Sequence, residues 1–265
     1  MARLDVELVK QELVPSRAKA QELIKNKSVK INGKLATKAS IMINDEDNIE
    51  ILPNDTLKYV SRGGLKLDKA INEFNIDFNN KIVMDIGSST GGFTDCALKH
   101  GASKVIAIDV GTNVMVDELR KDERVDLHEQ LNIKDASSQL FDGVDIIVSD
   151  VSFISLKKVI DVIVKQDKKY DMVLLIKPQF ECGKDIADKY KGIILDKEVH
   201  YNILKDITMY LENNKYYINN ICASPIKGGD GNIEYLIYVR PTYTEDTMYY
   251  VNYKELIDDT FKKVK

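Results

Sequence analysis

Three carboxylates and one ammonium group stand at the ends of consecutive apolar runs in the sequence. The runs and their charged residues are Lys81–Ile86 with Asp85, Lys104–Asp109 with Asp109, Val144–Ser149 with Asp150, and Asp171–Ile176 with Lys177. Ligands of an open α/β sheet bind beyond the carboxyl ends of its strands, so we expect the four groups to converge on one cleft. A lysine whose pKa is lowered by burial and a second cation can then, as the neutral amine, accept the proton of a weakly acidic hydroxyl.

The first of these runs leads into a glycine-rich turn that runs from Gly87 through Gly91 and Gly92 to Phe93. Glycine lets a backbone approach a ligand closely at a strand-to-helix turn. The turn lacks the GxGxxG spacing that a dinucleotide pyrophosphate requires. Asp109 stands 24 residues after Asp85, where a carboxylate accepts the hydroxyl protons of a ribose. An adenosine-bearing ligand that lacks a pyrophosphate is S-adenosylmethionine, which is therefore the predicted cofactor.

Seven strands are needed to position these residues. Besides the four runs above, three further strand-like runs are present: Val125–His128, Tyr216–Ala223 and Ile233–Val239. Continuous apolar runs of this kind are typical of strands buried on both faces of a largely parallel sheet. The last two are separated by a short loop, which predicts an antiparallel pair. The pattern therefore favours an α/β fold with the seven-stranded, Rossmann-like sheet of class I methyltransferases over a dehydrogenase sheet.

The first forty residues differ in charge from the rest of the chain. They hold nine Lys and Arg against four Asp and Glu, whereas the remainder holds 29 against 38. A basic head on an acidic body predicts contact with nucleic acid, although a solvated helical face is the alternative. Apolar spacing predicts two short helices, the first reaching Leu13, with a break at Pro15-Ser16. Asn32-Gly33 predicts a tight turn, and Asn48–Leu52 a closing strand.

Several classes of protein are excluded by what the sequence contains. The three cysteines, Cys96, Cys182 and Cys222, are odd in number and far apart, which argues against a disulfide framework and a CxxC site. The three histidines are equally scattered, so no metal is expected. No apolar run approaches the eighteen or so residues that span a bilayer, and the N-terminus does not resemble a secretory signal. We therefore expect a cytoplasmic monomer that does not act on membranes.

The order of motifs resembles the TlyA family of rRNA (cytidine-2′-O)-methyltransferases, often labelled hemolysins. In the head the matching motifs are Arg3–Asp5, Ser16–Ala20 and Val29–Gly33, and in the body they are Ser61–Lys66, Asp85–Asp95, Asp109–Asn113, Ser149–Phe153, Lys177–Glu181 and Ser224–Glu234. The resemblance covers roughly residues 2–240. It implies an S4 α+β RNA-binding domain at 1–58, a linker and first helix at 59–80, and an FtsJ-like methyltransferase domain at 81–265.

The resemblance also implies roles for individual residues. It implies a Lys-Asp-Lys-Glu catalytic set of Lys66, Asp150, Lys177 and Glu234, with Lys177 as the base for the ribose 2′-hydroxyl of a cytidine in ribosomal RNA. Cofactor contacts are expected from Gly63, Asp85, Gly87, Ser88, Gly91, Gly92, Phe93, Asp109, Asn132 and Asp150. Contacts to RNA phosphates are expected from Arg3, Arg17, Lys19, Lys30, Lys34 and Arg62.

Two segments depart from the family pattern. Lys227-Gly228-Gly229 stands where the family commonly has Lys-Gly-Pro, and the change is expected to loosen the approach to Glu234. Val114–Asp117 replaces the usual residues after Thr112-Asn113. Neither change removes a residue of the implied catalytic set.

Three alternative functions remain open at this point. Methylation of a cytosine carbon would need a nucleophilic cysteine, for which Cys182, five residues after Lys177, is the nearest candidate. A membrane-acting cytolysin would need an apolar or amphipathic membrane segment. A non-catalytic rRNA-binding assembly factor would have no need for the four polar groups. The target nucleotide, and whether one or both ribosomal subunits are substrates, are not indicated.

Overall fold

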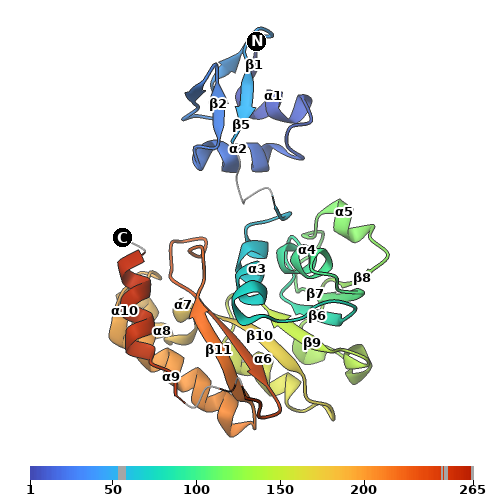
Figure 1. Cartoon of the computed structure of the whole chain (residues 1–265), viewed down its shortest axis with the longest axis vertical. Coiled ribbons are helices and arrows are strands. Elements are labelled where there is room, and N and C mark those ends of the chain that lie inside the picture. The colour runs from blue at the N-terminus through green and yellow to red at the C-terminus, as the bar shows by residue number, and fades with distance from the viewer. Residues whose placement is uncertain (53–57, 246, 248–249, 264–265) are drawn as a thin grey trace. The chain divides into compact units, whose positions relative to one another are not determined.

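A computed structural model describes residues 1–52, 58–245, 247 and 250–263. The chain divides into two compact units, Met1–Lys58 and Tyr59–Lys265. Each unit has its own apolar core. The helices and strands of each unit can be followed in Figure 1.

The N-terminal unit packs two helices against short strands. Its elements are β1 Ala2–Arg3, α1 Leu4–Lys10, α2 Arg17–Lys25, β2 Val29–Ile31, β3 Lys34–Leu35, β4 Met42–Ile43 and β5 Ile49–Ile51. The predicted break is present, because the Ser16 hydroxyl accepts a hydrogen bond from the Lys19 amide and so caps α2. Asn32 and Gly33 both have positive φ, as a tight β2–β3 hairpin requires. The first helix ends before Leu13, however, and Leu13 is 40% exposed.

The second unit is built on one seven-stranded sheet. Its strands are β6 Ile82–Ile86, β7 Lys104–Ile108, β8 Val125–His128, β9 Ile146–Ser149, β10 Asp171–Ile176, β11 Tyr217–Ala223 and β12 Tyr235–Arg240. Their order is β11-β12-β10-β9-β6-β7-β8, and β12 runs antiparallel to both of its neighbours. The seven predicted strands and the antiparallel final pair are confirmed. The last strand begins later than predicted, since its pairing with β10 starts at Tyr235, so Glu234 precedes it.

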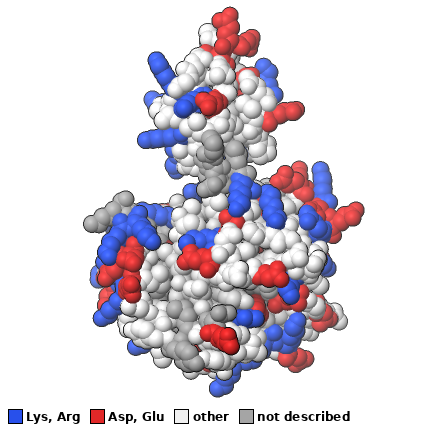
Figure 2. Space-filling model, viewed as in Figure 1, with Lys and Arg blue, Asp and Glu red and all other residues white. Residues whose placement is uncertain are grey.

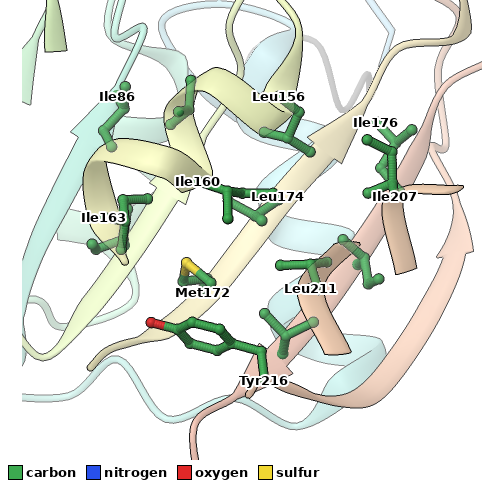
Figure 3. Packing of buried hydrophobic residues seen from close by; sticks show 14 of the residues in the cluster. Ile86, Leu156, Ile160, Ile163, Met172, Leu174, Ile176, Ile207, Leu211 and Tyr216 are labelled. Carbon is green, nitrogen blue, oxygen red and sulfur yellow. The ribbon is translucent and has the colours of Figure 1, made fainter. Parts of the chain in front are cut away.

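Helices cover both faces of this sheet. One apolar cluster holds residues of α6 Leu156–Ile163, α9 Lys197–Asn213 and α10 Tyr253–Lys263, and the other holds residues of α3 Gly63–Phe74, α4 Gly92–Lys99 and α5 Asp117–Arg120. Shorter helices are α7 Pro178–Glu181, α8 Lys184–Lys189 and the 3-10 helices Ile133–Asp135 and Ser138–Phe141. Side chains of β10 alternate between the two faces, and Figure 3 shows Met172, Leu174 and Ile176 packed with α6 and α9.

The C-terminal tail packs on the body through α10. Ile257 is 2% exposed, and the Tyr253 and Thr208 hydroxyls are 2.6 Å apart. Within the described ranges, no helix combines the length and the apolarity that a bilayer crossing demands.

Candidate active site

Strand register brings three of the predicted catalytic residues to one edge of the sheet. Ile176, the last residue of β10, pairs with Tyr235, the first residue of β12. Lys177 and Glu234 are the next residues outward on these antiparallel strands, so both lie just beyond the paired residues at the same edge of the sheet. Asp150 follows β9, which runs parallel to β10 beside it.

The fourth residue, Lys66, reaches the same place from α3 and joins the others in a chain of ion pairs. Lys66 Nζ lies 2.8 Å from Glu234 Oε2 and 3.1 Å from Asp150 Oδ2. The other carboxylate oxygen of Asp150 lies 2.5 Å from Lys177 Nζ. Lys177 Nζ in turn donates a hydrogen bond of 2.9 Å to the Ser152 hydroxyl. The four charges are therefore in contact, although up to 168 residues separate them along the chain.

Because these side chains are largely removed from water, their ion pairs strongly affect the pKa values of the groups involved. Lys66 is 7% exposed and Glu234 is 2% exposed. Burial by itself lowers the pKa of Lys66, but the facing carboxylates of Asp150 and Glu234 outweigh it, and the net pKa is raised. The pKa of Asp150 is lowered, because the two lysines outweigh the effect of its burial. Lys66 thus stays an ammonium group at neutral pH and does not have the lowered pKa expected of a base.

Three further residues hold this cluster in place and were not assigned roles from the sequence. Ser152 accepts from Lys177, as described above. Gln179 Nε2 donates to Glu234 Oε1 at 3.2 Å. A Cβ on Gly228 would lie 2.5 Å from the same oxygen, so Gly228 gives Glu234 its space, whereas a Cβ on Gly229 would meet nothing within 4 Å. All three lie within motifs that the sequence offers, but their contacts depend on the tertiary fold.

Two cavities meet at this cluster. One, of about 290 Å³, is lined by Lys66, Asp150, Lys177 and residues of the glycine-rich turn. The other, of about 670 Å³, extends past Asp109 and Asn132. They share Gly87, Ser89, Asp150 and Ser152, so together they form one elongated cleft along the carboxyl ends of the strands. A larger cavity of about 880 Å³ is lined by residues at the other ends of the strands, including Lys81 and Asp171.

The first cavity has the features of a site for a small polar ligand. Gly87 has a φ of +85°, and a Cβ there would lie 3.0 Å from the Asp150 carbonyl oxygen. A Cβ on Gly92 would lie 2.3 Å from Ser61 Oγ. The hydroxyl of Ser88, which is 4% exposed, has no hydrogen-bond partner among the described residues. Gly63 and Phe93 also line this cavity, whereas Gly91 takes a φ of +97° at the cap of α4 and lines neither cavity.

The second cavity presents polar groups that suit an adenosine. The Asp109 carboxylate accepts hydrogen bonds from the backbone amides of Ser89 and Gly111, at 2.8 and 2.7 Å. These bonds fix the carboxylate where a ribose would need it. Asn132 caps the Ile133–Asp135 helix through its side-chain oxygen, and apolar residues such as Ile133 and Val159 line the wall beside it.

Asp85 lies beneath the glycine-rich turn and lines neither cavity. Its carboxyl is fully buried, and Thr94 Oγ1 donates to its Oδ2 at 2.7 Å. Burial raises the pKa of Asp85 to about 7, with Asp150 and Asp109 adding to the effect against the Thr94 hydrogen bond. Asp85 therefore supports the turn from behind.

We expect this carboxyl to make the stability of the protein depend on pH. Between about pH 4 and pH 7 the folded state holds a proton that the unfolded state has lost, so stability falls as pH rises. From pH 5 to pH 8 the loss due to Asp85 is about 3 kcal/mol. Between pH 5 and pH 8, the free energy of unfolding measured in urea should fall by about 3 kcal/mol less in Asp85→Asn than in the unaltered protein. Equal pH dependence in both proteins would contradict a raised pKa of the Asp85 carboxyl in the folded state.

The predicted RNA-contacting residues differ in accessibility. In the N-terminal unit, Arg3 and Arg17 both pair with the buried Asp5, yet keep 45% and 57% of their side chains exposed. Lys19 is only 7% exposed and lies 3.4 Å from Glu22. Little of its side chain is therefore available to contact an RNA phosphate. Lys34 is exposed. Acidic side chains are interspersed with basic ones over the visible face of each unit (Figure 2).

The other two predicted cations are placed differently. Lys30 is partly exposed and lies in β2, one residue before the strand ends. Arg62, in the second unit, lines the first cavity of the cleft beside Lys66. A negatively charged substrate entering that cavity would therefore meet Arg62.

Comparison with known proteins agrees with this architecture. The FtsJ-like methyltransferase family model matches residues 59–240, and the S4 domain model matches residues 2–49. Hemolysin A of Brachyspira hyodysenteriae is 46% identical over 89% of this chain and 98% of its own length. The 16S/23S rRNA (cytidine-2′-O)-methyltransferase TlyA of Mycobacterium tuberculosis is 35% identical over 90% of both chains.

A solved structure of a proposed hemolysin from Streptococcus thermophilus superposes with a TM-score of 0.76 at 36% identity, covering 99% of this chain and 96% of that one. These matches extend over both units of the chain. The chain belongs to the TlyA family, in which an S4 domain precedes an FtsJ-like methyltransferase domain.

Proposed function

We propose that this protein transfers a methyl group from S-adenosylmethionine to the ribose 2′-hydroxyl of a cytidine in ribosomal RNA. The observation that carries the proposal is the buried chain of ion pairs from Glu234 through Lys66 and Asp150 to Lys177, at the junction of the two cavities. Relatives named as rRNA (cytidine-2′-O)-methyltransferases support the choice of substrate.

The cofactor is assigned to the elongated cleft. Gly63, Gly87, Ser88, Gly92 and Phe93 would hold its methionine half, where the Ser88 hydroxyl has no partner within the described part of the chain. Asp109 would accept hydrogen bonds from the ribose hydroxyls and Asn132 would lie beside the adenine. When bound there, S-adenosylmethionine supplies an electrophilic methyl group at the junction of the cavities.

Lys177 is the proposed base of the reaction. It contacts one carboxylate and one hydroxyl, whereas Lys66 contacts two carboxylates. A neutral Lys177 amine can take the 2′-hydroxyl proton, and the resulting ammonium is stabilised by Asp150 at 2.5 Å. Lys66 remains positive and stabilises charge that develops on the substrate oxygen. Gln179 holds the Glu234 carboxylate in place, and Glu234 in turn keeps the Lys66 ammonium group directed at the cleft.

Base methylation is less compatible with the site. Cys182 Sγ lies 3.5 Å from the Gly183 carbonyl oxygen and 3.9 Å from that of Gln179, and it lines neither cavity of the cleft. Burial raises the pKa of this thiol, which reduces the thiolate available for attack on a cytosine carbon.

One exposed aromatic ring, that of Phe153, lies at the mouth of the cleft and is proposed to stack on the target base. Phe153 is 91% exposed and lines the second cavity. Its ring centre lies 5.0 Å from that of Phe180, over which Lys177 Nζ lies at 5.8 Å. Phe153 also has a φ of +62°, a conformation that costs a bulky residue energy. Exposure and strain together indicate that this ring is held out to meet a ligand.

Phe153→Ala should therefore reduce kcat/KM for RNA by about 5- to 150-fold, which corresponds to the loss of one stacked base. Phe153→Tyr, which keeps the ring, should retain most of the activity. Tm should not fall, because the side chain is exposed. Steady-state methyl transfer to rRNA measures the effect, and an unchanged rate in the alanine variant would remove Phe153 from the substrate site.

The N-terminal unit is proposed to bind rRNA phosphates through Arg3, Arg17, Lys30 and Lys34. Asp5 pairs with both arginines and thereby orients them at the surface. Lys30 and Lys34 flank the Asn32-Gly33 turn on paired strands. Such contacts position RNA without reading its bases.

Replacing Lys30 and Lys34 together by glutamine should weaken RNA binding and reduce the slope of log K against log salt by about one for each phosphate that is no longer neutralised. Filter binding at several salt concentrations measures this. The same double change at Lys254 and Lys262 in α10 is the matched control and should leave the slope unchanged. Equal slopes in all three proteins would contradict an RNA role for the turn.

The function itself is tested by mapping 2′-O-methyl groups in rRNA from cells with and without the gene. We expect at least one cytidine to lose its 2′-O-methyl group when the gene is deleted and to regain it on complementation. An unchanged 2′-O-methylation map would contradict the proposed reaction.

A further inference from the structure

A carboxylate, a thiol and an imidazole meet on the helices behind the glycine-rich turn. The potential ligand atoms of Asp68, Cys96 and His100 all lie within 4.8 Å of one another. Asp68 Oδ1 and His100 Nε2 are 2.9 Å apart. Cys96 is fully buried, while the side chains of Asp68 and His100 keep 15% and 24% of their surface exposed. The group therefore extends from the interior to the surface, and a small ion could reach it from solvent.

The fold creates this group from two packed helices. Cys96 in α4 and His100 at its C-terminal cap are four residues apart, so they lie on the same face of the helix. Asp68 comes from α3, which packs against α4. The Tyr59 hydroxyl donates to Asp68 Oδ1 at 2.8 Å, the kind of outer hydrogen bond that orients a ligating carboxylate.

We propose that Asp68, Cys96 and His100 form a zinc-binding site, with water completing the coordination. Thiolate sulfur, imidazole nitrogen and carboxylate oxygen are the donors that zinc takes in proteins, and three protein ligands plus a water make a tetrahedral site. At normal zinc–ligand lengths the ligand atoms of a tetrahedral site lie about 3.3–3.6 Å apart. The ligand atoms lie within 4.8 Å of one another, with 2.9 Å between those of Asp68 and His100, and side-chain movement would bring them to that spacing as the ion binds.

The site would be structural, and it is independent of the proposed reaction. Among the described residues that line the two cavities of the cleft, none of the three is present. The ion would join α3, which carries Lys66 two residues before Asp68, to α4, which begins at the glycine-rich turn. The sequence alone does not predict this metal, because its histidines are scattered and Asp68 is 28 residues from Cys96.

Cobalt titration of the full chain, after treatment with a chelator, tests the site. One equivalent of Co²⁺ should release the thiol proton and produce a thiolate-to-cobalt charge-transfer band, and Zn²⁺ should abolish the band by displacing the cobalt. Cys96→Ser should abolish the band. His100→Gln, at a partly exposed helix end, should fold normally and bind cobalt at least about tenfold more weakly.

Two other cysteines provide matched controls. Cys182→Ser, which removes the more accessible thiol, and Cys222→Ser, which removes another buried one, should both retain the full band at one equivalent. Zn²⁺ should also raise the Tm of these controls but not that of Cys96→Ser. Absence of the band in the unaltered chain, or its loss in Cys182→Ser instead of Cys96→Ser, would overturn the proposal. Methyl transfer need not be measured, so the result does not depend on the proposed function.

Discussion

Lys177→Ala is expected to reduce methyl transfer to rRNA by about 10²- to 10⁴-fold, the range that a positioned general base contributes. The substitution removes the lysine of the cluster that contacts a single carboxylate. Asp150 keeps its ion pair with Lys66 at 3.1 Å and Glu234 keeps its own at 2.8 Å, so each carboxylate of the cluster retains a cationic partner. The loss should therefore be in kcat, with the cofactor Kd changed little. Single-turnover transfer of labelled methyl and equilibrium binding of S-adenosylmethionine measure the two quantities.

The control for this prediction is a lysine on the same unit but outside the cleft. Lys205 is exposed on α9, and Lys205→Ala should retain full activity. A Lys177→Ala enzyme that keeps near-normal kcat would show that another group accepts the proton.

Lys66→Ala is expected to destabilise the protein by about 3–5 kcal/mol, as well as to inactivate it, because removing one partner leaves a buried charge uncompensated. The charge left behind is Glu234, which is 2% exposed and has Lys66 as its ion-pair partner at 2.8 Å. Among the residues that the structure describes, Gln179 would be the remaining side-chain donor to Glu234, and the charged form of this buried carboxyl would be destabilised. Urea unfolding at neutral pH measures the difference.

A double substitution separates the charge effect from a packing effect. Lys66→Met combined with Glu234→Gln removes both charges while keeping similar volumes, so most of the lost stability should return. Activity should stay low, because the ammonium group beside the reacting oxygen is still missing. If the double variant were less stable than Lys66→Ala, the cost would come from lost packing and not from an unpaired charge.

The sheet could be predicted from the sequence because its signals are local. Apolar runs mark each strand, and Asn32-Gly33 and Ser16 mark a hairpin and a helix start through their own backbone preferences. Element ends were harder to predict. Glu234 precedes β12, since strand pairing and not hydrophobicity sets where a strand begins.

The site could be predicted only in part, because several of its determinants are not local. Strand ends converge by topology, so Asp150 and Lys177 could be placed together in advance. The burial of Lys19 and the position of Asp85 beneath the turn depend on which face of an element meets its neighbour. The sign of the pKa change at Lys66 depends on two carboxylates that approach from different strand ends, and burial alone predicts the opposite sign.

The proposed reaction depends on four clustered ionisable side chains, those of Lys66, Asp150, Lys177 and Glu234, that make a sugar oxygen reactive. The most direct measurement is to incubate the purified chain with rRNA and S-adenosylmethionine carrying a labelled methyl group, and then to hydrolyse the RNA with alkali. Methylation of a 2′-oxygen blocks cleavage at that nucleotide, so we predict that the label is recovered in an alkali-resistant dinucleotide that contains cytidine. Recovery of the label in single nucleotides methylated on the base would contradict the proposed reaction.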